Sequence, residues 1–119
     1  MAKVLVVDDE KMICEEFRDI LQDEGHQVDI ALSGRDALVK VEEHPYDIVF
    51  LDVLMPRMEG REVFEQMKKI HAAMPVVIMS GYLPPNKETD ALKMGALACL
   101  RKPLELERVR SLISSVTSK

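Results

Sequence analysis

The 119-residue sequence has no tryptophan and few other aromatic residues, which together make up 4% of the chain. It has no block of lysines or arginines, and its formal net charge is −5. Proteins that bind nucleic acids normally present a basic patch, and sites for single strands add aromatic side chains for stacking. The composition therefore argues against direct DNA or RNA binding by this segment.

Cysteine is scarce as well. The two cysteines, Cys14 and Cys99, form neither a metal-ligand spacing nor a redox pair in the sequence. This usage is typical of a protein in a reducing compartment. No apolar run is long enough to cross a membrane, and Met1 leads directly into a strand-like segment without a signal-peptide pattern. We therefore expect a cytoplasmic protein without a membrane-spanning segment.

The chain has the length and composition of one globular domain, expected to cover residues 1–119, with 47% hydrophobic and 31% charged residues. Its strand signals are short apolar segments rich in β-branched residues, the clearest being 3–7 (KVLVV), 47–51 (DIVFL) and 75–79 (PVVIM). Such near-continuous hydrophobicity is typical of strands covered on both faces. Segment 27–32 alternates more and segment 97–100 is weaker, and we predict strands there too.

Amphipathic segments lie between the predicted strands. The apolar positions that share a helical face are Ile13, Phe17, Ile20 and Leu21; Ala37, Leu38 and Val41; Val63, Met67 and Ile70; and Val109, Leu112, Ile113 and Val116. Segment 86–94 is the least amphipathic helix candidate. Ser33 is a candidate N-cap, and Gly25 and Gly95 are candidate helix stops. The strict alternation of strands and helices predicts a doubly wound α/β domain with a parallel sheet.

Polar residues stand where four of the predicted strands end. The run 8–10 (DDE) follows the first strand, Asp52 the third, Ser80 the fourth and Lys102 the fifth. The carboxyl ends of parallel strands share one edge of the sheet, and open α/β sheets bind their ligands beyond that edge. We therefore expect several carboxylates, a hydroxyl and an ammonium group to converge there.

That combination of groups fits a phosphate-and-metal site. Adjacent carboxylates repel one another, and Mg²⁺ relieves the repulsion by taking one or two of them together with waters and a phosphate. An aspartate carboxylate can attack phosphorus to form an acyl phosphate. Catalysis of this transfer is mostly positioning and charge neutralisation, for which Lys102 supplies a cation and Ser80 a hydrogen-bond donor.

Each of these residues also has a simpler interpretation. Taken singly, Asp52 is typical of a turn or helix cap, and the run 8–10 of a solvated helix start. Ser80 with Gly81 is typical of a turn, and Lys102 of a surface lysine. Their joint position at four strand ends favours the phosphate-and-metal site over four unrelated roles.

Four segments carry a resemblance to a known family: VLVVDDE, IVFLDVLMPRMEG, VVIMSGY and LRKPL. In order and spacing they resemble the receiver domain of two-component response regulators, from Lys3 to the last predicted helix. The resemblance implies a flavodoxin-like, five-stranded parallel sheet of order 2-1-3-4-5. It also implies a signalling switch that takes a phosphoryl group from a histidine kinase or phosphotransfer protein and acts on an output protein or effector domain.

The resemblance also assigns roles to single residues. Asp52 matches the phosphorylated aspartate; Asp9 and Asp52 match direct Mg²⁺ ligands, Asp8 an acid that acts through water, and Leu54 a backbone carbonyl ligand. Ser80 matches the switch hydroxyl that hydrogen-bonds the phosphoryl group, and Lys102 matches the family's lysine, followed by a cis bond to Pro103. Such a domain catalyses its own phosphorylation and dephosphorylation and is not a turnover enzyme.

One position departs from the family pattern. Many members have an aromatic residue three positions before the lysine, which moves inward with the switch hydroxyl, whereas this chain has Cys99. A cysteine has no ring to move between core and surface. We therefore expect the switch to act through loop and helix movement around Ser80.

Three other functions are alternatives to this one. A haloacid-dehalogenase-type phosphatase usually needs a second acid two residues after its nucleophile, but Leu54 stands there. A pseudo-receiver that only binds a partner would have no need for the full set of acids, hydroxyl and lysine. A flavin-binding domain would need a Ser/Thr/Gly-rich phosphate loop after the first strand, which the run 8–10 does not provide.

Overall fold

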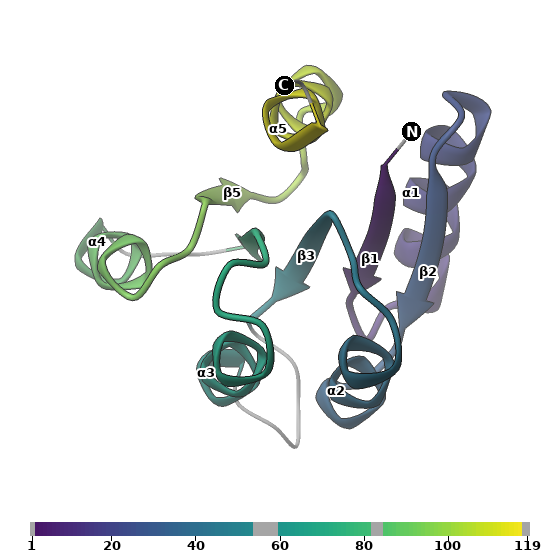
Figure 1. Cartoon of the computed structure of the whole chain (residues 1–119). Coiled ribbons are helices and arrows are strands. Elements are labelled where there is room, and N and C mark those ends of the chain that lie inside the picture. Colours follow the sequence, from purple (N-terminus) through teal and green to yellow (C-terminus); the bar gives the residue numbers. More distant parts are fainter. Residues whose placement is uncertain (1, 54–59, 82–84, 118–119) are drawn as a thin grey trace.

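A computed structural model of the chain describes residues 2–53, 60–81 and 85–117, in which strands and helices alternate (Figure 1). The strands are β1 (Lys3–Val7), β2 (Gln27–Ala31), β3 (Ile48–Asp52), β4 (Val76–Ser80) and β5 (Ala98–Arg101). The helices are α1 (Lys11–Asp23), α2 (Gly34–Glu43), α3 (Gly60–Ile70), α4 (Pro85–Lys93) and α5 (Leu106–Thr117). Within the described ranges, no helix combines the length and the apolar character that a membrane span requires.

All neighbouring strands pair in parallel, in the order β2-β1-β3-β4-β5. The expected doubly wound fold and strand order are therefore confirmed. β3 and β4 lie inside the sheet, and every residue of both strands is buried. This explains their nearly continuous hydrophobicity, because neither face of either strand meets water.

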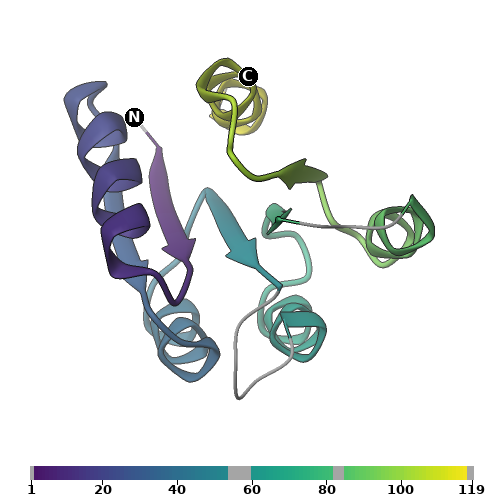
Figure 2. The same cartoon turned by 180° about the vertical axis from the view of Figure 1, so that it is seen from behind.

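Helices cover both faces of the sheet (Figures 1 and 2). α2 and α3 pack on one face against residues such as Leu5 and Val49. α1 and α5 pack on the other face against Val6 and Phe50, among others. Successive strand residues point to opposite faces, so that each interior strand contributes alternately to the two cores. α4 adds the partly buried Ala91 to the first core.

Two strands end one residue later than predicted. The strands expected at 47–51 and 75–79 end instead at Asp52 and Ser80, which makes both polar residues part of the sheet. The limits shift because parallel pairing continues through these positions: Asp52 still pairs with Met79 of β4, and Ser80 pairs with the last residue of β5. The side chains of Asp52 and Ser80 are therefore held by regular strand backbone rather than by loops.

Local signals at the helix ends behave as predicted. The Ser33 hydroxyl accepts a hydrogen bond of 3.1 Å from the Asp36 amide and caps α2. Gly25 and Gly95 follow α1 and α4 with φ angles of 94° and 103°, a backbone region that favours glycine. Both glycines therefore stop their helices.

The buried face of α1 differs from the prediction at one position. Ile20 was expected on this face but is 40% exposed, whereas Cys14 and Leu21 are fully buried. The sheet-facing stripe runs through Cys14, Phe17 and Leu21, a spacing of three and four residues that lies on one helical face. Ile20 lies beside this stripe. The buried face of α1 thus differs from the predicted one, and Cys14 contacts the residue that follows β1.

Candidate functional site

The structure brings the predicted polar residues to the carboxyl edge of the sheet. Asp8 follows β1, Asp52 and Ser80 end β3 and β4, and Lys102 follows β5. Asp8, Asp52 and Ser80 are buried, with relative exposures of 0%, 4% and 0%. A charged group that is taken out of water is normally paired or bound to a metal. Two buried carboxylates at one edge therefore indicate a site built for a cation.

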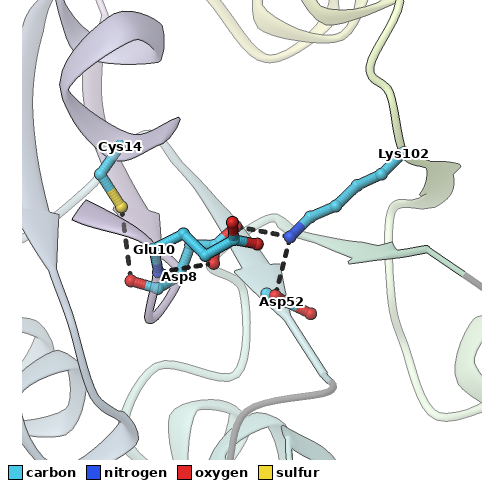
Figure 3. A network of polar contacts seen from close by, with 5 residues as sticks. All are labelled: Asp8, Glu10, Cys14, Asp52 and Lys102. Atoms are coloured by element: carbon cyan, nitrogen blue, oxygen red, sulfur yellow. Dashed lines mark hydrogen bonds and ion pairs between the residues drawn. The ribbon is translucent and has the colours of Figure 1, made fainter. Parts of the chain in front are cut away.

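Lys102 supplies a cation in this structure. Its ammonium group donates to Asp8 Oδ2 at 2.6 Å and to Asp52 Oδ2 at 2.8 Å (Figure 3). Burial alone would lower the pKa of Lys102, but the hydrogen bonds to Asp52 and Asp8 outweigh it and raise that pKa above its usual value. The group is thus charged throughout the physiological range and neutralises one of the two buried negative charges.

The backbone keeps Lys102 close to Ser80. The Lys102 amide donates to the Ser80 carbonyl at 2.9 Å, which extends the β4–β5 pairing beyond the end of β5. The Lys102–Pro103 peptide bond is cis, as the resemblance implied. Lys102 and Ser80, which were predicted to bind phosphoryl oxygens, therefore lie on adjacent segments at the edge of the sheet.

Asp8, Asp9 and Glu10 form what we call the acidic turn, which leads from β1 into α1. Carboxylate oxygens of these three residues lie within 4.8 Å of one another; Asp8 is buried, and the other two are exposed. The Glu10 amide donates to Asp8 Oδ1 at 3.0 Å. Both oxygens of Asp8 are thus held, one by this amide and the other by Lys102.

The donor set fits Mg²⁺, which prefers oxygen ligands and binds through one or two carboxylates while keeping several waters. The acidic turn offers clustered carboxylate oxygens. Lys102 forms ion pairs with both Asp8 of this turn and Asp52, which places Asp52 beside the cluster. Sequence reasoning included Glu10 in the run of acids but not among the ligands, although it belongs to the cluster. The predicted ligand Leu54 lies outside the described residues.

Sequence reasoning missed Cys14. Its thiol donates to the Asp8 backbone carbonyl at 3.4 Å, as Figure 3 shows, and its side chain is fully buried. The signal was available in the helical spacing, since Cys14 lies three residues before Phe17 and seven before Leu21. Position 14 was interpreted only as a lone cysteine.

Comparison with known proteins gives one family. The family model of the response regulator receiver domain matches residues 4–114. The transcriptional regulatory protein ZraR of Salmonella typhimurium is 37% identical over 107 residues, which are 90% of this chain and 24% of that protein. The response regulator MprA of Mycolicibacterium vanbaalenii is 34% identical over 119 residues, covering 97% of this chain and 52% of its own length. The chain spans about a quarter to a half of these relatives.

Solved structures agree with this assignment. The chemotaxis protein CheY4 of Vibrio cholerae matches with a TM-score of 0.88 and 32% identity over 98% of both chains. The response regulator protein TrrA of Thermotoga maritima, crystallised in complex with Mg²⁺–BeF, matches with a TM-score of 0.85 and 29% identity. That match covers 98% of this chain and 99% of the other. By its sequence and its fold, this chain belongs to the response regulator receiver domain family.

Proposed function

We propose that this domain is a phosphoacceptor switch in which Asp52 takes a phosphoryl group in a Mg²⁺-dependent reaction. The observation that carries the proposal is the pairing of one ammonium, from Lys102, with two buried carboxylates, Asp8 and Asp52. A buried site with this charge pattern is arranged for the transfer of an anionic group, because both the cation and the nucleophile are already in place.

In the proposed reaction a carboxylate oxygen of Asp52 attacks the phosphorus of the donor. The new bond forms between that oxygen and phosphorus, and the bond from phosphorus to the donor's leaving group breaks. Lys102 lies 2.8 Å from Asp52 Oδ2 and neutralises charge on the incoming phosphoryl oxygens. Mg²⁺, when bound, supplies further neutralisation. Asp9, Asp52 and the Leu54 carbonyl would hold it directly, with Asp8 acting through water.

The switch would act on the side of the site formed by α4, β5 and α5. α4 buries no side chain, which marks it as weakly anchored. Cys99 lines an open surface pocket together with Glu88 of α4 and Arg108 of α5. A phosphoryl group that hydrogen-bonds Ser80 would favour one arrangement of this region over another, a population shift that a partner can recognise.

The proposed partners follow from the family. The phosphodonor is a sensor histidine kinase or a phosphotransfer protein, and the recipient of the signal is an output protein or effector domain. Like its family, the domain would undergo one stoichiometric phosphorylation and reset itself, without turning over an external substrate. The relatives named as transcriptional regulatory proteins support an output in gene regulation, carried by segments beyond the part that matches this chain.

The test is intact-mass analysis after incubation with Mg²⁺ and acetyl phosphate. The unaltered chain is expected to gain the mass of one phosphoryl group. Asp52→Asn, or the unaltered chain with EDTA, is expected to gain none. Circular dichroism of Asp52→Asn confirms that the variant is folded. An unchanged mass of folded, unaltered protein in the presence of Mg²⁺ would contradict the proposal.

A further inference from the structure

The start of α1 lacks an ordinary cap. Glu10 is the N-cap residue, its side chain makes no capping hydrogen bond, and the first turn of the helix contains no acidic residue. Helix starts are usually held by a Ser, Thr, Asp or Asn side chain at this position. The connection between α1 and the acidic turn therefore depends on other contacts.

Cys14 makes two of these contacts. Its amide donates to the Glu10 carbonyl at 3.1 Å, which is the first hydrogen bond of the helix. Its thiol donates to the Asp8 carbonyl at 3.4 Å. The Glu10 amide also donates to Asp8 Oδ1. Asp8 is therefore held at its side chain by the N-cap residue and at its backbone carbonyl by Cys14 of α1 (Figure 3).

We propose that Cys14 is a positioning residue for the Mg²⁺ site, whose thiol orients the Asp8–Asp9 peptide and thereby the Asp9 carboxylate. The inference rests on the Mg²⁺ site of the proposed function. The Asp8 carbonyl and the Asp9 nitrogen belong to one planar unit. A hydrogen bond to that carbonyl therefore restricts the direction in which Asp9 leaves the turn, although the Cys14 side chain itself is no ligand.

The surroundings of Cys14 preserve the donor. The side chain is fully buried in the core that Val6 and Phe50 share with α1. Burial above all, and then the negative charge of Asp8, raise the pKa of Cys14 to about 11. A cysteine thiol with its ordinary pKa is already mostly protonated at neutral pH, so the hydrogen bond to the Asp8 carbonyl requires no shift.

The expected effect on metal affinity is moderate. Residues that orient metal ligands from the second shell typically change affinity by about 10- to 100-fold when they are removed. A thiol is a weak donor, and its target is a backbone carbonyl rather than the ligand itself. For loss of the Cys14 hydrogen bond we therefore expect Mg²⁺ binding to weaken about three- to ten-fold.

Two variants of the same shape separate positioning from core filling. Cys14→Val fills the core without a donor, whereas Cys14→Thr has nearly the same shape and retains a hydroxyl donor. If Cys14 only filled space, the valine variant would match the unaltered chain in Mg²⁺ affinity. The threonine variant would then bind Mg²⁺ no more tightly than the valine variant. Positioning predicts the opposite ranking of affinities. The valine variant should bind Mg²⁺ more weakly than the threonine variant, although its apolar side chain suits the core better.

The experiment titrates MgCl₂ into each chain by calorimetry and measures the urea midpoint without metal. Cys14→Val is expected to raise the Mg²⁺ dissociation constant about three- to ten-fold while keeping a midpoint near that of the unaltered chain. Cys14→Thr should recover most of the affinity. In metal-free protein, the amide resonance of Asp9 should shift in the valine variant and return toward its original position in the threonine variant.

Cys99→Val and Cys99→Thr are matched controls on β5, expected to leave the Mg²⁺ affinity unchanged. If either Cys14 variant fails to fold, Cys14→Ala repeats the test, because it removes the donor without adding a branched side chain. A valine or alanine variant within two-fold of the unaltered affinity, or a threonine variant as weak as valine, would overturn the inference alone. Absence of Mg²⁺ binding by the unaltered chain would instead overturn the proposed metal site, and this inference with it.

Discussion

The two sides of the carboxyl edge of the sheet differ in how firmly they are packed. On one side, the β2–β1–β3 half, every residue of β3 is buried, and α1 and α2 each anchor fully buried side chains. On the other side, the α4–β5 region, α4 buries no side chain, and only Ala98 and Leu100 of the four residues of β5 are buried. Elements with few buried contacts are those that open or shift most readily. The acids therefore stand on the firmly packed half, whereas the surface that we propose reports phosphorylation includes the weakly packed α4–β5 region.

Lys102 connects these two regions. It follows β5, yet its ammonium group binds Asp8 and Asp52, which follow or end strands of the firm half. Any event that changes the charge on Asp52 therefore changes a contact that reaches across to the α4–β5 region. We expect the α4–β5 region to move in response, because elements with few buried contacts shift more readily than firmly packed ones.

The largest expected effect tests the packing contrast itself. Phe50 is fully buried and its ring centre lies 5.2 Å from that of Phe17. Phe50→Ala is expected to lower the free energy of unfolding by about 3–5 kcal/mol. Leu92→Ala in α4 is expected to change it by less than about 0.5 kcal/mol. Urea unfolding measures both, and similar losses in the two variants would show that α4 is as firmly packed as β3.

The next effect concerns the connection between the two regions. Lys102→Met leaves the buried carboxylates of Asp8 and Asp52 without their cation. We expect a loss of about 2 kcal/mol in the absence of metal, less than for a fully enclosed pair because Lys102 is 19% exposed. Mg²⁺ should then raise the melting temperature of this variant more than that of the unaltered chain. Calorimetry with and without Mg²⁺ measures this, with the exposed Lys93→Met as control; an equal Mg²⁺ response would argue against a shared site.

A smaller effect depends on pH and reports on the firm half. The Tyr46 hydroxyl donates to Asp29 Oδ2 of β2 at 2.6 Å. Burial above all, and then this hydrogen bond, raise the pKa of Tyr46 above its usual value of 10.0. Its contribution to stability is therefore complete below pH 10 and is lost as the pH rises further, because the unfolded chain releases the proton first.

Tyr46→Phe is expected to cost about 1 kcal/mol at pH 7, the usual net value of a hydrogen bond. Its stability should also decline less steeply than that of the unaltered chain between about pH 9.5 and 11. Urea midpoints across this range give both slopes. Parallel slopes would mean that Tyr46 loses its proton equally readily in the folded and unfolded chains.

The smallest effect compares two glycines near the weakly held region. Gly95 has a φ of 103°, so Gly95→Ala is expected to cost about 1 kcal/mol. A Cβ at Gly81 would meet no described atom within 4 Å, and Gly81→Ala is expected to change stability by less than about 0.5 kcal/mol. Thermal unfolding distinguishes the two variants. A larger loss at Gly81 would show that backbone freedom at the end of β4 matters more than at the end of α4.

Much of this molecule was predictable from local patterns. The apolar runs predicted five parallel strands, and Ser33, Gly25 and Gly95 predicted helix limits, because caps and stops depend on neighbours along the chain. The convergence of Asp52 and Lys102 was also predictable, since parallel strands bring their carboxyl ends to one edge. The strand limits at Asp52 and Ser80 were missed by one residue, because pairing across the sheet decides where a strand ends.

The sequence by itself determined the fold class and the residue types at the carboxyl edge of the sheet. It did so because hydrophobic periodicity and strand order are properties of short segments. Only the tertiary structure decided that Lys102 bridges Asp8 and Asp52, 94 and 50 positions away, and that the thiol of Cys14 closes the acidic turn. Tertiary packing also left α4 without a buried side chain. These features depend on distances and orientations between elements, which no local pattern contains.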